Sequence, residues 1–545
     1  MIVAGSLAFI PGTAQAADPV APKTQGAAPS AVDLGKAAAD NFKTFTSPAD
    51  RTVRRALPQA KGKTGAAAPQ AEAQAAVGNP ELAILLNAES TSAHGLGLTT
   101  TITSAPASLN VKIEWGDGTA DTVAAAGSTV LKNQHSYAKL GEYTVKVTVT
   151  DAANNAEVVN DFSIMTAGSD FTPYTPTRIL DTREGIGAAK GTVGPYGTTR
   201  LKIGGNGGIP AGVTAVALNV TVTNTSGDGF VTVYPEGRER PATSNLNFKA
   251  GQSVPNMVIV PVGKNGYVDL YNHYSSVDLV ADVTGYFTRG SSSGYTPQAP
   301  SRIVDTREGL GTRRGQVPSK GKFNLTVGPA GRYTAVALNV TVTNPQNSGF
   351  LTLTPGGQAA PPTSNLNFTT GQTIANSVIV PVAADGSIDV LNGGWGGVDV
   401  VIDFVGYYST DSKAAYIPIG PFRTLDTREP EWKYGPLERD SYVSIGYSPN
   451  EPNIAGYVLN TTVTNTQADG YLSVAPNPNT WEDVKNHTGM PVTPPGSSSL
   501  NWTKGQTVPN LVQASSGNHG VVDFWNRSWG NIDLVVDIFG YYETN

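Results

Sequence analysis

The residues best suited to chemistry lie in a seven-residue motif that occurs three times. The motif, Arg-x-x-Asp-Thr-Arg-Glu, begins at Arg178, Arg302 and Arg423. It brings two guanidinium groups and two carboxylates together, and the planar fork of arginine suits bidentate pairing with a carboxylate. The candidate ligand-binding residues within it are Asp181, Arg183, Asp305, Arg307, Asp426 and Arg428.

Three roles fit this motif. The favoured role is an ion-pair network that ties the first strand of each copy to its last strand. In that network Asp181 accepts from backbone amides or from Arg178, and Arg183 meets Asp282. The second role is a rim of Asp and Arg side chains that grips sugar hydroxyls or an anion. The third role is a carboxylate pair for glycoside hydrolysis.

Aspartates also recur towards the end of each copy. Asp278 and Asp282 are four residues apart. On a strand they share a face but lie about 13 Å apart, at a rise of roughly 3.3 Å per residue. One ion cannot bridge that distance, so a calcium site would need ligands from a neighbouring strand or loop. We predict structural roles for Asp282, Asp403 and Asp537, with calcium as the alternative and no other metal or cofactor.

Amide side chains recur inside the predicted strands. Asn219, Asn339 and Asn460 occupy one repeated position, and Asn247, Gln252 and Asn256 mark others in the first copy. Amides are unusual in strands unless they bond to backbone at bends or edges, which predicts a structural role. Sugar recognition would use the same amides beside an aromatic platform, because aromatic faces pack on the C–H faces of pyranose rings.

Aromatic candidates for such a platform lie near the end of each copy. Trp395 stands in the glycine-rich stretch 392–397, which favours an exposed loop, and the third copy has Trp525 and Trp529. The first copy offers only Tyr274 at the matching place. We include the three tryptophans among the candidate ligand-binding residues.

The sequence gives no support for nucleophilic catalysis. None of the five histidines recurs in all three copies, and His-Glu-x-x-His does not occur. There is no cysteine, which excludes disulfides and thiolate metal sites. We predict no catalytic residues, and a carbohydrate-active enzyme remains the least favoured alternative.

Each copy must be a complete sheet-built domain. The copies recur at intervals of 120 and 121 residues, measured from Asn219 to Asn339 and Asn460, which is far longer than a solenoid repeat. Short segments with alternating apolar residues predict strands, such as 216–222 and 277–283. The pattern leaves a β-sandwich, a jelly roll and a small barrel open. The predicted domains span 172–289, 293–410 and 414–545, and the third carries an insertion at 476–496.

The preceding part of the chain divides into three segments. Residues 1–16 contain an apolar run and end in Ala14-Gln-Ala16, which is typical of a signal peptide. Residues 17–78 are rich in Ala and Pro and almost lack aromatics, which predicts a disordered linker or pro-segment. Residues 79–167 show strand alternation, with Tyr143, Val145, Val147 and Val149 on one face.

Two resemblances follow from these motifs. The Trp-Gly-Asp-Gly-Thr stretch at Trp115 and the later His-Ser-Tyr and Gly-Glu-Tyr-Thr-Val stretches resemble the PKD domain. That resemblance implies an immunoglobulin-like β-sandwich that serves as a spacer or binding module. We expect Trp115 to fill its core and Asp117 to accept turn amides. The three later copies resemble a repeated domain of secreted actinobacterial proteins, which implies location and modularity but no chemistry.

These observations favour a secreted, non-catalytic, all-β protein. It would bind polysaccharide or a cell-wall surface through three equivalent modules, each held together by its own shared polar residues. The alternative is a structural surface protein that self-assembles. The net charge of −6 shows no basic footprint, so nucleic acid is excluded as a partner, and no apolar run of the kind that spans a bilayer occurs after the leader.

Overall fold

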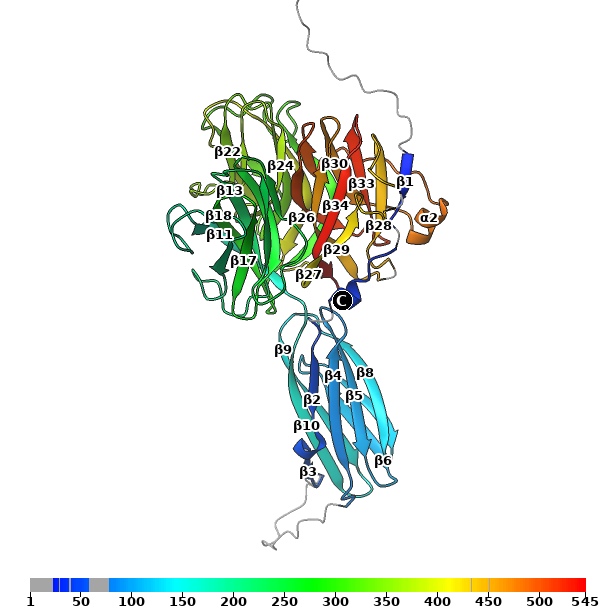
Figure 1. Ribbon diagram of the computed structural model, residues 1–545. Coiled ribbons are helices and arrows are strands. Elements are labelled where there is room, and N and C mark those ends of the chain that lie inside the picture. Colours follow the sequence, from blue (N-terminus) through cyan, green and yellow to red (C-terminus); the bar gives the residue numbers. More distant parts are fainter. Residues whose placement is uncertain (1–22, 29, 39–40, 58–77, 433, 450) are drawn as a thin grey trace, which may run out of the picture.

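The computed structural model describes residues 23–28, 30–38, 41–57, 78–432, 434–449 and 451–545. A narrow β-sandwich, residues 78–167, stands below a broad head, residues 170–545, which contains the three repeated copies (Figure 1). Almost all of the described secondary structure is β-strand, so the predicted all-β class is confirmed. The predicted signal peptide, residues 1–16, lies outside the described residues.

Two sheets form the sandwich, in the strand orders β3-β10-β9-β6-β7 and β2-β4-β5-β8. In β9 the side chains of Val145, Val147 and Val149 are fully buried, while those between them are partly exposed, as a period of two requires. Trp115 is buried in this core, and Asp117 accepts from the Thr119 amide at 3.0 Å. The strands are β4 (Ala83–Ser90), β5 (Gly95–Thr103), β6 (Ser108–Glu114), β7 (Ala120–Ala126), β8 (Thr129–Ser136), β9 (Glu142–Asp151) and β10 (Ala156–Met165).

Copy one is a jelly roll, which resolves the topology that the sequence left open. Its sheets have the orders β11-β18-β13-β16 and β12-β17-β14-β15, the arrangement of two interlocked Greek keys. Nearly all of β13 is buried, because one face meets the second sheet and the other faces the neighbouring copies. The strands are β11 (Asp170–Asp181), β12 (Thr198–Lys202), β13 (Ala215–Thr223), β14 (Gly229–Pro235), β15 (Leu246–Phe248), β16 (Val254–Pro261), β17 (Tyr267–His273) and β18 (Asp278–Thr288).

Copy two repeats the same strand order. Its strands are β19 (Gly294–Asp305), β20 (Lys322–Thr326), β21 (Ala335–Thr343), β22 (Gly349–Pro355), β23 (Leu366–Phe368), β24 (Ile374–Pro381), β25 (Ser387–Asn392) and β26 (Asp399–Ser409).

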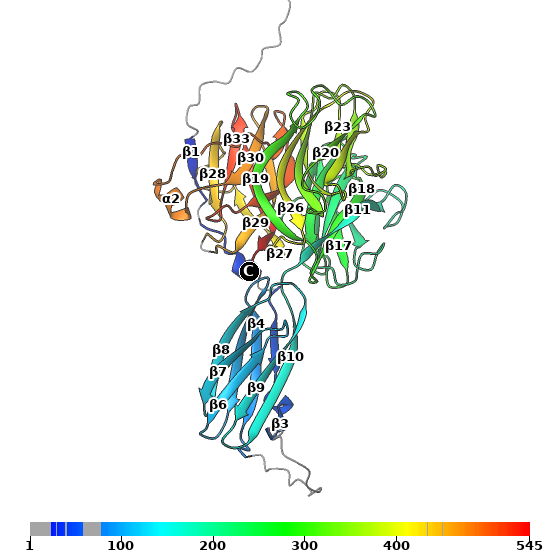
Figure 2. The same ribbon diagram turned by 180° about the vertical axis from the view of Figure 1, so that it is seen from behind.

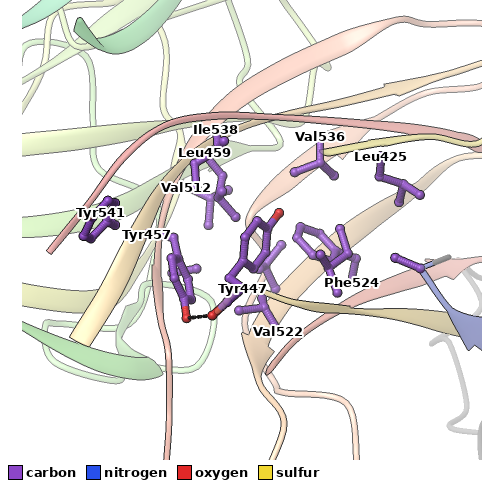
Figure 3. Packing of buried hydrophobic residues seen from close by; sticks show 14 of the residues in the cluster. Leu425, Tyr447, Tyr457, Leu459, Val512, Val522, Phe524, Val536, Ile538 and Tyr541 are labelled. Carbon is purple, nitrogen blue, oxygen red and sulfur yellow. Dashed lines mark hydrogen bonds between the residues drawn. The ribbon is translucent and has the colours of Figure 1, made fainter. Parts of the chain in front are cut away.

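Copy three has the same topology plus one added strand and one helix. Its insertion contains α2 (Trp481–Asn486), which begins with a capping box between Thr480 and Asp483. Tyr447 and Tyr457 lie in its core, where the Tyr457 hydroxyl donates to the Tyr447 carbonyl at 2.8 Å (Figure 3). The strands are β27 (Ala415–Asp426), β28 (Ser441–Gly446), β29 (Ile454–Thr464), β30 (Gly470–Pro476), β31 (Leu500–Trp502), β32 (Val508–Ser515), β33 (Val521–Ser528) and β34 (Asp533–Glu543).

The three copies pack around one axis and share an apolar core there. Each copy keeps a core of its own, but the three copies are not isolated modules. Residues that a single copy would expose, such as Ala217 and Ile259, are fully buried because the other two copies cover them. The aromatic members of the shared core are Phe171, Tyr295 and Tyr416 from the first strands and Phe287, Tyr408, Phe539 and Tyr542 from the last strands.

We call the segment 23–57 the strap. Its described residues form paired strands, so the prediction of disorder is wrong for them. The strand β1 (Lys23–Ala27) adds to copy three in parallel with β28, and α1 (Leu34–Ala37) follows it. The strands β2 (Thr44–Ser47) and β3 (Val53–Arg55), separated by a short 3-10 turn at Ala49–Arg51, then join the two sheets of the sandwich.

The physical reason is that the strap needs no core of its own. Each of its strands pairs with the edge of a sheet that other segments have built, so main-chain hydrogen bonds hold it. Figures 1 and 2 show the strap, drawn in blue, passing from copy three to the sandwich.

Candidate functional site

The Arg-x-x-Asp-Thr-Arg-Glu motif forms a tight turn after the first strand of each copy. In copy one the Asp181 carbonyl accepts from the amides of Gly185 and Ile186 at 2.9 and 3.0 Å. Its carboxylate accepts from the Arg183 amide at 3.1 Å and from the Arg183 guanidinium at 2.9 and 2.6 Å. The same carboxylate contacts recur between Asp305 and Arg307 and between Asp426 and Arg428.

The first arginine of the motif joins the first strand to the last. Arg178 lies opposite Asp282 in the strand ladder and donates to its two oxygens at 2.9 and 3.2 Å. The predicted pairing of Arg183 with Asp282 is wrong, because the turn brings the Arg183 side chain back onto Asp181. Arg302 with Asp403 and Arg423 with Asp537 repeat the arrangement of Arg178.

Burial and charge leave little of this motif available to a ligand. The exposed fractions of Asp181 and Asp282 are 1% and 2%. The Arg183 guanidinium lowers the pKa of Asp181, whereas burial raises the pKa of Asp282 despite the opposing effect of Arg178. Two closed ion pairs of this kind provide neither an open carboxylate pair for hydrolysis nor free acceptors for sugar hydroxyls.

The repeated asparagines bond between copies as well as within them. Asn219 of copy one donates to the Ser364 carbonyl of copy two at 2.6 Å and accepts from Asn376 at 3.0 Å. Asn376 in turn accepts from the Met257 amide of copy one at 3.1 Å. Asn339 with Ser498 and Asn510, and Asn460 with Ser244 and Asn256, repeat the pattern.

These contacts run from copy one to copy two, from copy two to copy three, and from copy three back to copy one. We call Asn219, Asn256, Asn339, Asn376, Asn460 and Asn510 the asparagine ring. Each member is buried, and its amide is paired on both the oxygen and the nitrogen. Three of these residues hold their own copy together, as expected, and all six also join neighbouring copies, which was not expected.

Two polar contacts beside the ring also cross between copies. The Asp403 carboxylate of copy two accepts from the Ser498 amide of copy three at 3.1 Å. Arg423 of copy three donates to the Ala242 carbonyl of copy one at 3.1 Å. The motif arginines and the last-strand aspartates therefore help to set how one copy docks on the next.

The remaining repeated aspartates have protein partners too. Asp278 accepts from the Thr182 hydroxyl and from Asn224, each at 2.8 Å, and Asp269 pairs with Arg200 at 2.9 Å. No group of three or more His, Asp or Glu side chains is placed to hold a metal ion in the described ranges. The structure thus supplies no cluster for the calcium alternative among these residues.

Exposed aromatic side chains mark the end of the head that faces away from the sandwich. Glu543, near the end of β34, accepts from the sandwich amide of Ala93 at 2.7 Å, so the loop before β34 lies at the opposite end of that strand. Corresponding loops precede the last strands of the other copies. We call this end the distal face. Trp395 and Trp529 on it are each 77% exposed and Tyr274 is 59% exposed.

Trp525 does not belong to this group. It is 1% exposed and stacks on Tyr442 at a centroid distance of 4.1 Å. Its predicted position in a ligand-binding surface is wrong, because it lies within β33 with its side chain packed, whereas Trp529 lies in the loop that follows.

Neighbouring side chains support the exposed rings. In copy two the Lys320 ammonium lies 4.4 Å from the Trp395 ring centroid, a cation–π contact. In copy one the Tyr196 ring meets Tyr274 edge-on at 6.2 Å. Tyr196 and Lys320 precede the second strand of their copies, some 75 residues before the aromatic loop, so sequence spacing could not reveal these contacts.

A cavity of about 700 Å³ opens on the axis between the copies. It has contributions from all three, at the starts of β16, β24 and β32 and along β15, β23 and β31. Tyr274 stands among its lining residues, so the cavity belongs to the distal face. Its repeated lining positions are Asn247, Asn367 and Asn501; Gln252, Gln372 and Gln506; Ser253, Thr373 and Thr507; and Val254, Ile374 and Val508. We call it the axial cavity.

Of these lining residues, the sequence had singled out only the recurring Asn247 and Gln252 positions. Their candidate role in sugar recognition required an aromatic platform near them, and Tyr274 is the platform residue that the structure places at the cavity. The hydroxyl and aliphatic positions that follow the glutamines carried no signal, because small polar and apolar residues are common at strand starts.

Comparisons with known proteins give only weak likenesses. No protein-family model matches the chain, and no curated protein matches it. Among solved structures, a carbohydrate-binding module of the β-sandwich superfamily is similar at 13% identity, a TM-score of 0.14, and coverage of 36% of this chain and 93% of that one. A SusE-like protein is similar at 8% identity, a TM-score of 0.11, and coverage of 35% and 93%.

A chain of the Sulfolobus turreted icosahedral virus is similar at 11% identity, a TM-score of 0.14, and coverage of 69% and 92%. Nothing about function follows from likenesses at these TM-scores. In the part of the chain that is described, no helix has the length and apolar character needed to span a bilayer.

Proposed function

We propose that this protein is a non-catalytic binder of extracellular polysaccharide, and that its distal face is the binding surface. The observation that carries the proposal is the exposure of one large aromatic side chain in the corresponding loop of every copy. Trp395 and Trp529 bury little of their surface in the folded chain, since each is 77% exposed. Large exposed rings of this kind mark interaction surfaces, and an indole face suits the C–H face of a sugar ring.

The ring of copies makes the face multivalent and fixes its geometry. The three loops are set by one shared core and by the asparagine ring, so little ordering is needed when a polymer binds. Binding one loop raises the effective concentration of ligand at the next two, which strengthens weak single contacts without new ones. A long polymer or a dense cell-wall surface offers the repeated ligand that this arrangement requires.

The sandwich then serves as a spacer, in line with its sequence resemblance to the PKD domain. It contacts the head at the end opposite the distal face, as the bond from Ala93 to Glu543 shows. A spacer at that end leaves the aromatic loops unobstructed. We also propose that the protein lies outside the cell, associated with the envelope, because extracellular polysaccharide is its proposed ligand.

The alternative of a purely self-assembling protein is less well supported. The repeated interfaces of the three copies close on one another within one chain, so they are not left open to propagate a lattice. Sedimentation of the full chain without polysaccharide checks this alternative, and ordered assemblies in that experiment would favour it.

Affinity electrophoresis of the full chain through gels containing soluble cellulose, chitin or xylan derivatives tests the proposal, together with pull-down on purified cell wall. We expect retardation on at least one polymer, and a progressive loss in Trp395→Ala, Trp529→Ala and the double variant. Met490→Ala is the matched control, because Met490 is a 66% exposed apolar residue in the insertion after α2. Retention that is equal for the control and the double variant would remove the aromatic loops as the site.

A further inference from the structure

The lining of the axial cavity is mostly uncharged and favours neither anions nor cations. At each repeated position it presents an amide, a hydroxyl or an aliphatic group from every copy. The charged lining residues are Asp228 and Lys249, both from copy one. Asp228 accepts from the Ala250 amide at 3.1 Å, so its charge is used within its own turn. An anionic or cationic ligand would enter this cavity without a matching set of counter-charges.

The repeated glutamines are held in one orientation. The side-chain oxygen of Gln252 accepts from the Lys249 amide at 2.9 Å, and those of Gln372 and Gln506 accept from Thr369 and Thr503 at 3.0 and 2.9 Å. Within the described residues, their amide nitrogens make no hydrogen bond to protein. Three fixed N–H donors thus surround the axis.

An acceptor is also present in the wall. The Asn501 side-chain oxygen is buried and has no hydrogen-bond partner within the described chain. Buried polar atoms are normally paired, and one left open at a cavity points to a group that binds there. Neutral donors and acceptors beside aliphatic side chains and Phe248 are the combination that recognises hydroxyl groups on an apolar ring face.

The floor of the cavity is closed. Pro509 lines the cavity, and the next residue, Asn510, belongs to the asparagine ring. Below the ring lies the shared apolar core, with Met257 and Leu511 buried on the axis. A ligand therefore enters from the distal face and cannot pass through the head. The cavity thus suits the end of a polymeric ligand better than its middle.

From these observations we propose that the axial cavity binds the terminal residues of a neutral oligosaccharide. This inference deepens the proposed function and rests on it for the class of ligand. The volume of about 700 Å³ falls within the range of about 300–1,000 Å³ that small-molecule sites occupy. The aromatic loops would hold the body of the polymer while the cavity reads its end.

Isothermal titration of the full chain with cellotriose, chitotriose, xylotriose and maltotriose tests the proposal. Ser253→Trp fills the cavity from an exposed position and breaks no hydrogen bond within the described residues. The triple variant Gln252→Glu, Gln372→Glu and Gln506→Glu keeps the acceptor of each turn and removes the donor. We expect one trisaccharide to bind, and each variant to weaken it at least about tenfold.

Met490→Ala, at an exposed position outside the cavity lining, is the reference and should leave trisaccharide affinity within about twofold. The proposal fails when none of the four trisaccharides binds the wild-type chain, or when both cavity variants bind one as well as wild type does. A variant that loses only polymer retention identifies the aromatic loops as the polymer site. A variant that loses only trisaccharide binding identifies the cavity as the oligosaccharide site. The proposed function and this inference can therefore fail independently.

Discussion

The side chain of Asn376 donates to the side chain of Asn219 at 3.0 Å, across 157 residues of sequence. One residue belongs to copy two and the other to copy one, and their two relatives around the axis make the same contact. A head assembled from three jelly rolls is thereby closed within a single chain. The geometry of the distal face depends on this closure, because each copy alone would present only one aromatic loop.

Removing one member of the asparagine ring should destabilise the whole head. In Asn219→Leu the Ser364 carbonyl loses its side-chain donor, and the buried Asn376 amide loses one of its two acceptors. A buried polar group without a partner costs about 1–3 kcal/mol, so we expect unfolding in urea to shift by about 2–4 kcal/mol. Asn265→Leu, at an exposed position whose side chain donates to Glu236, should change stability by less than about 0.5 kcal/mol. Equal stability of the two variants would show that the asparagine ring does not stabilise the head.

The motif arginines should contribute far more to folding stability than surface cations do. Arg423→Ala leaves the buried Asp537 carboxylate without its cation and removes the bond to Ala242 of copy one. Breaking a buried pair costs about 3–5 kcal/mol, and the partial exposure of Arg423 places the expected loss near the lower end. Lys485→Ala, which removes an exposed pair with Glu482, should cost less than about 1 kcal/mol. Denaturation of both variants provides the comparison, and a small effect of Arg423→Ala would argue that the motif serves a ligand instead.

Stability should decrease as the pH rises from about 5 to about 8. Burial raises the pKa of Glu543 to about 7, and the pKa values of Asp170, Asp523 and Asp537 to about 6. The folded chain then binds more protons than the unfolded chain across this range, so raising the pH through it favours unfolding. Melting curves measured across this range check the slope, and Glu543→Gln should flatten it.

The opposite trend should begin at lower pH. Arg183 and Arg307 lower the pKa values of Asp181 and Asp305, and the contacts with Arg428 lower that of Asp426 against the effect of burial. These carboxylates add stability above the pKa of an unfolded aspartate, about 3.9, and that stability is lost as the pH falls below it. A stability maximum between the two trends is expected, and a profile that rises steadily from pH 5 to 8 would contradict the assignment.

The strap should be needed for the full stability of the sandwich. Truncation of residues 1–57 removes β2 and β3 from the edges of both sheets, together with the bond from Ser47 to Asn160 at 2.6 Å. Newly exposed sheet edges favour aggregation, so we expect a lower melting temperature and concentration-dependent association. Truncation of residues 1–22 keeps all the described strands and is the control; a matching loss in both truncations would show that strand pairing is not the cause.

The local alternation of apolar residues was enough to predict many of the strands. The alternation in residues 216–222 predicts a strand, and that strand is β13; the apolar alternation of residues 143–149 predicts one face of β9. Such predictions succeed because side-chain direction along a strand depends only on the backbone. The pairing of Arg183 was mispredicted, because spacing alone does not show how a turn directs a long side chain.

The sequence by itself determined the class of the protein, the threefold recurrence, and the residue types that each copy shares. Only the tertiary structure decided that the copies share one core, that their asparagines bond across copies, that Trp525 is buried while Trp529 is exposed, and that the strap completes other sheets. The physical reason is that periodicity reports which face of a strand is apolar but not what covers it. Burial by a neighbouring copy and burial within the same copy leave the same pattern in the chain.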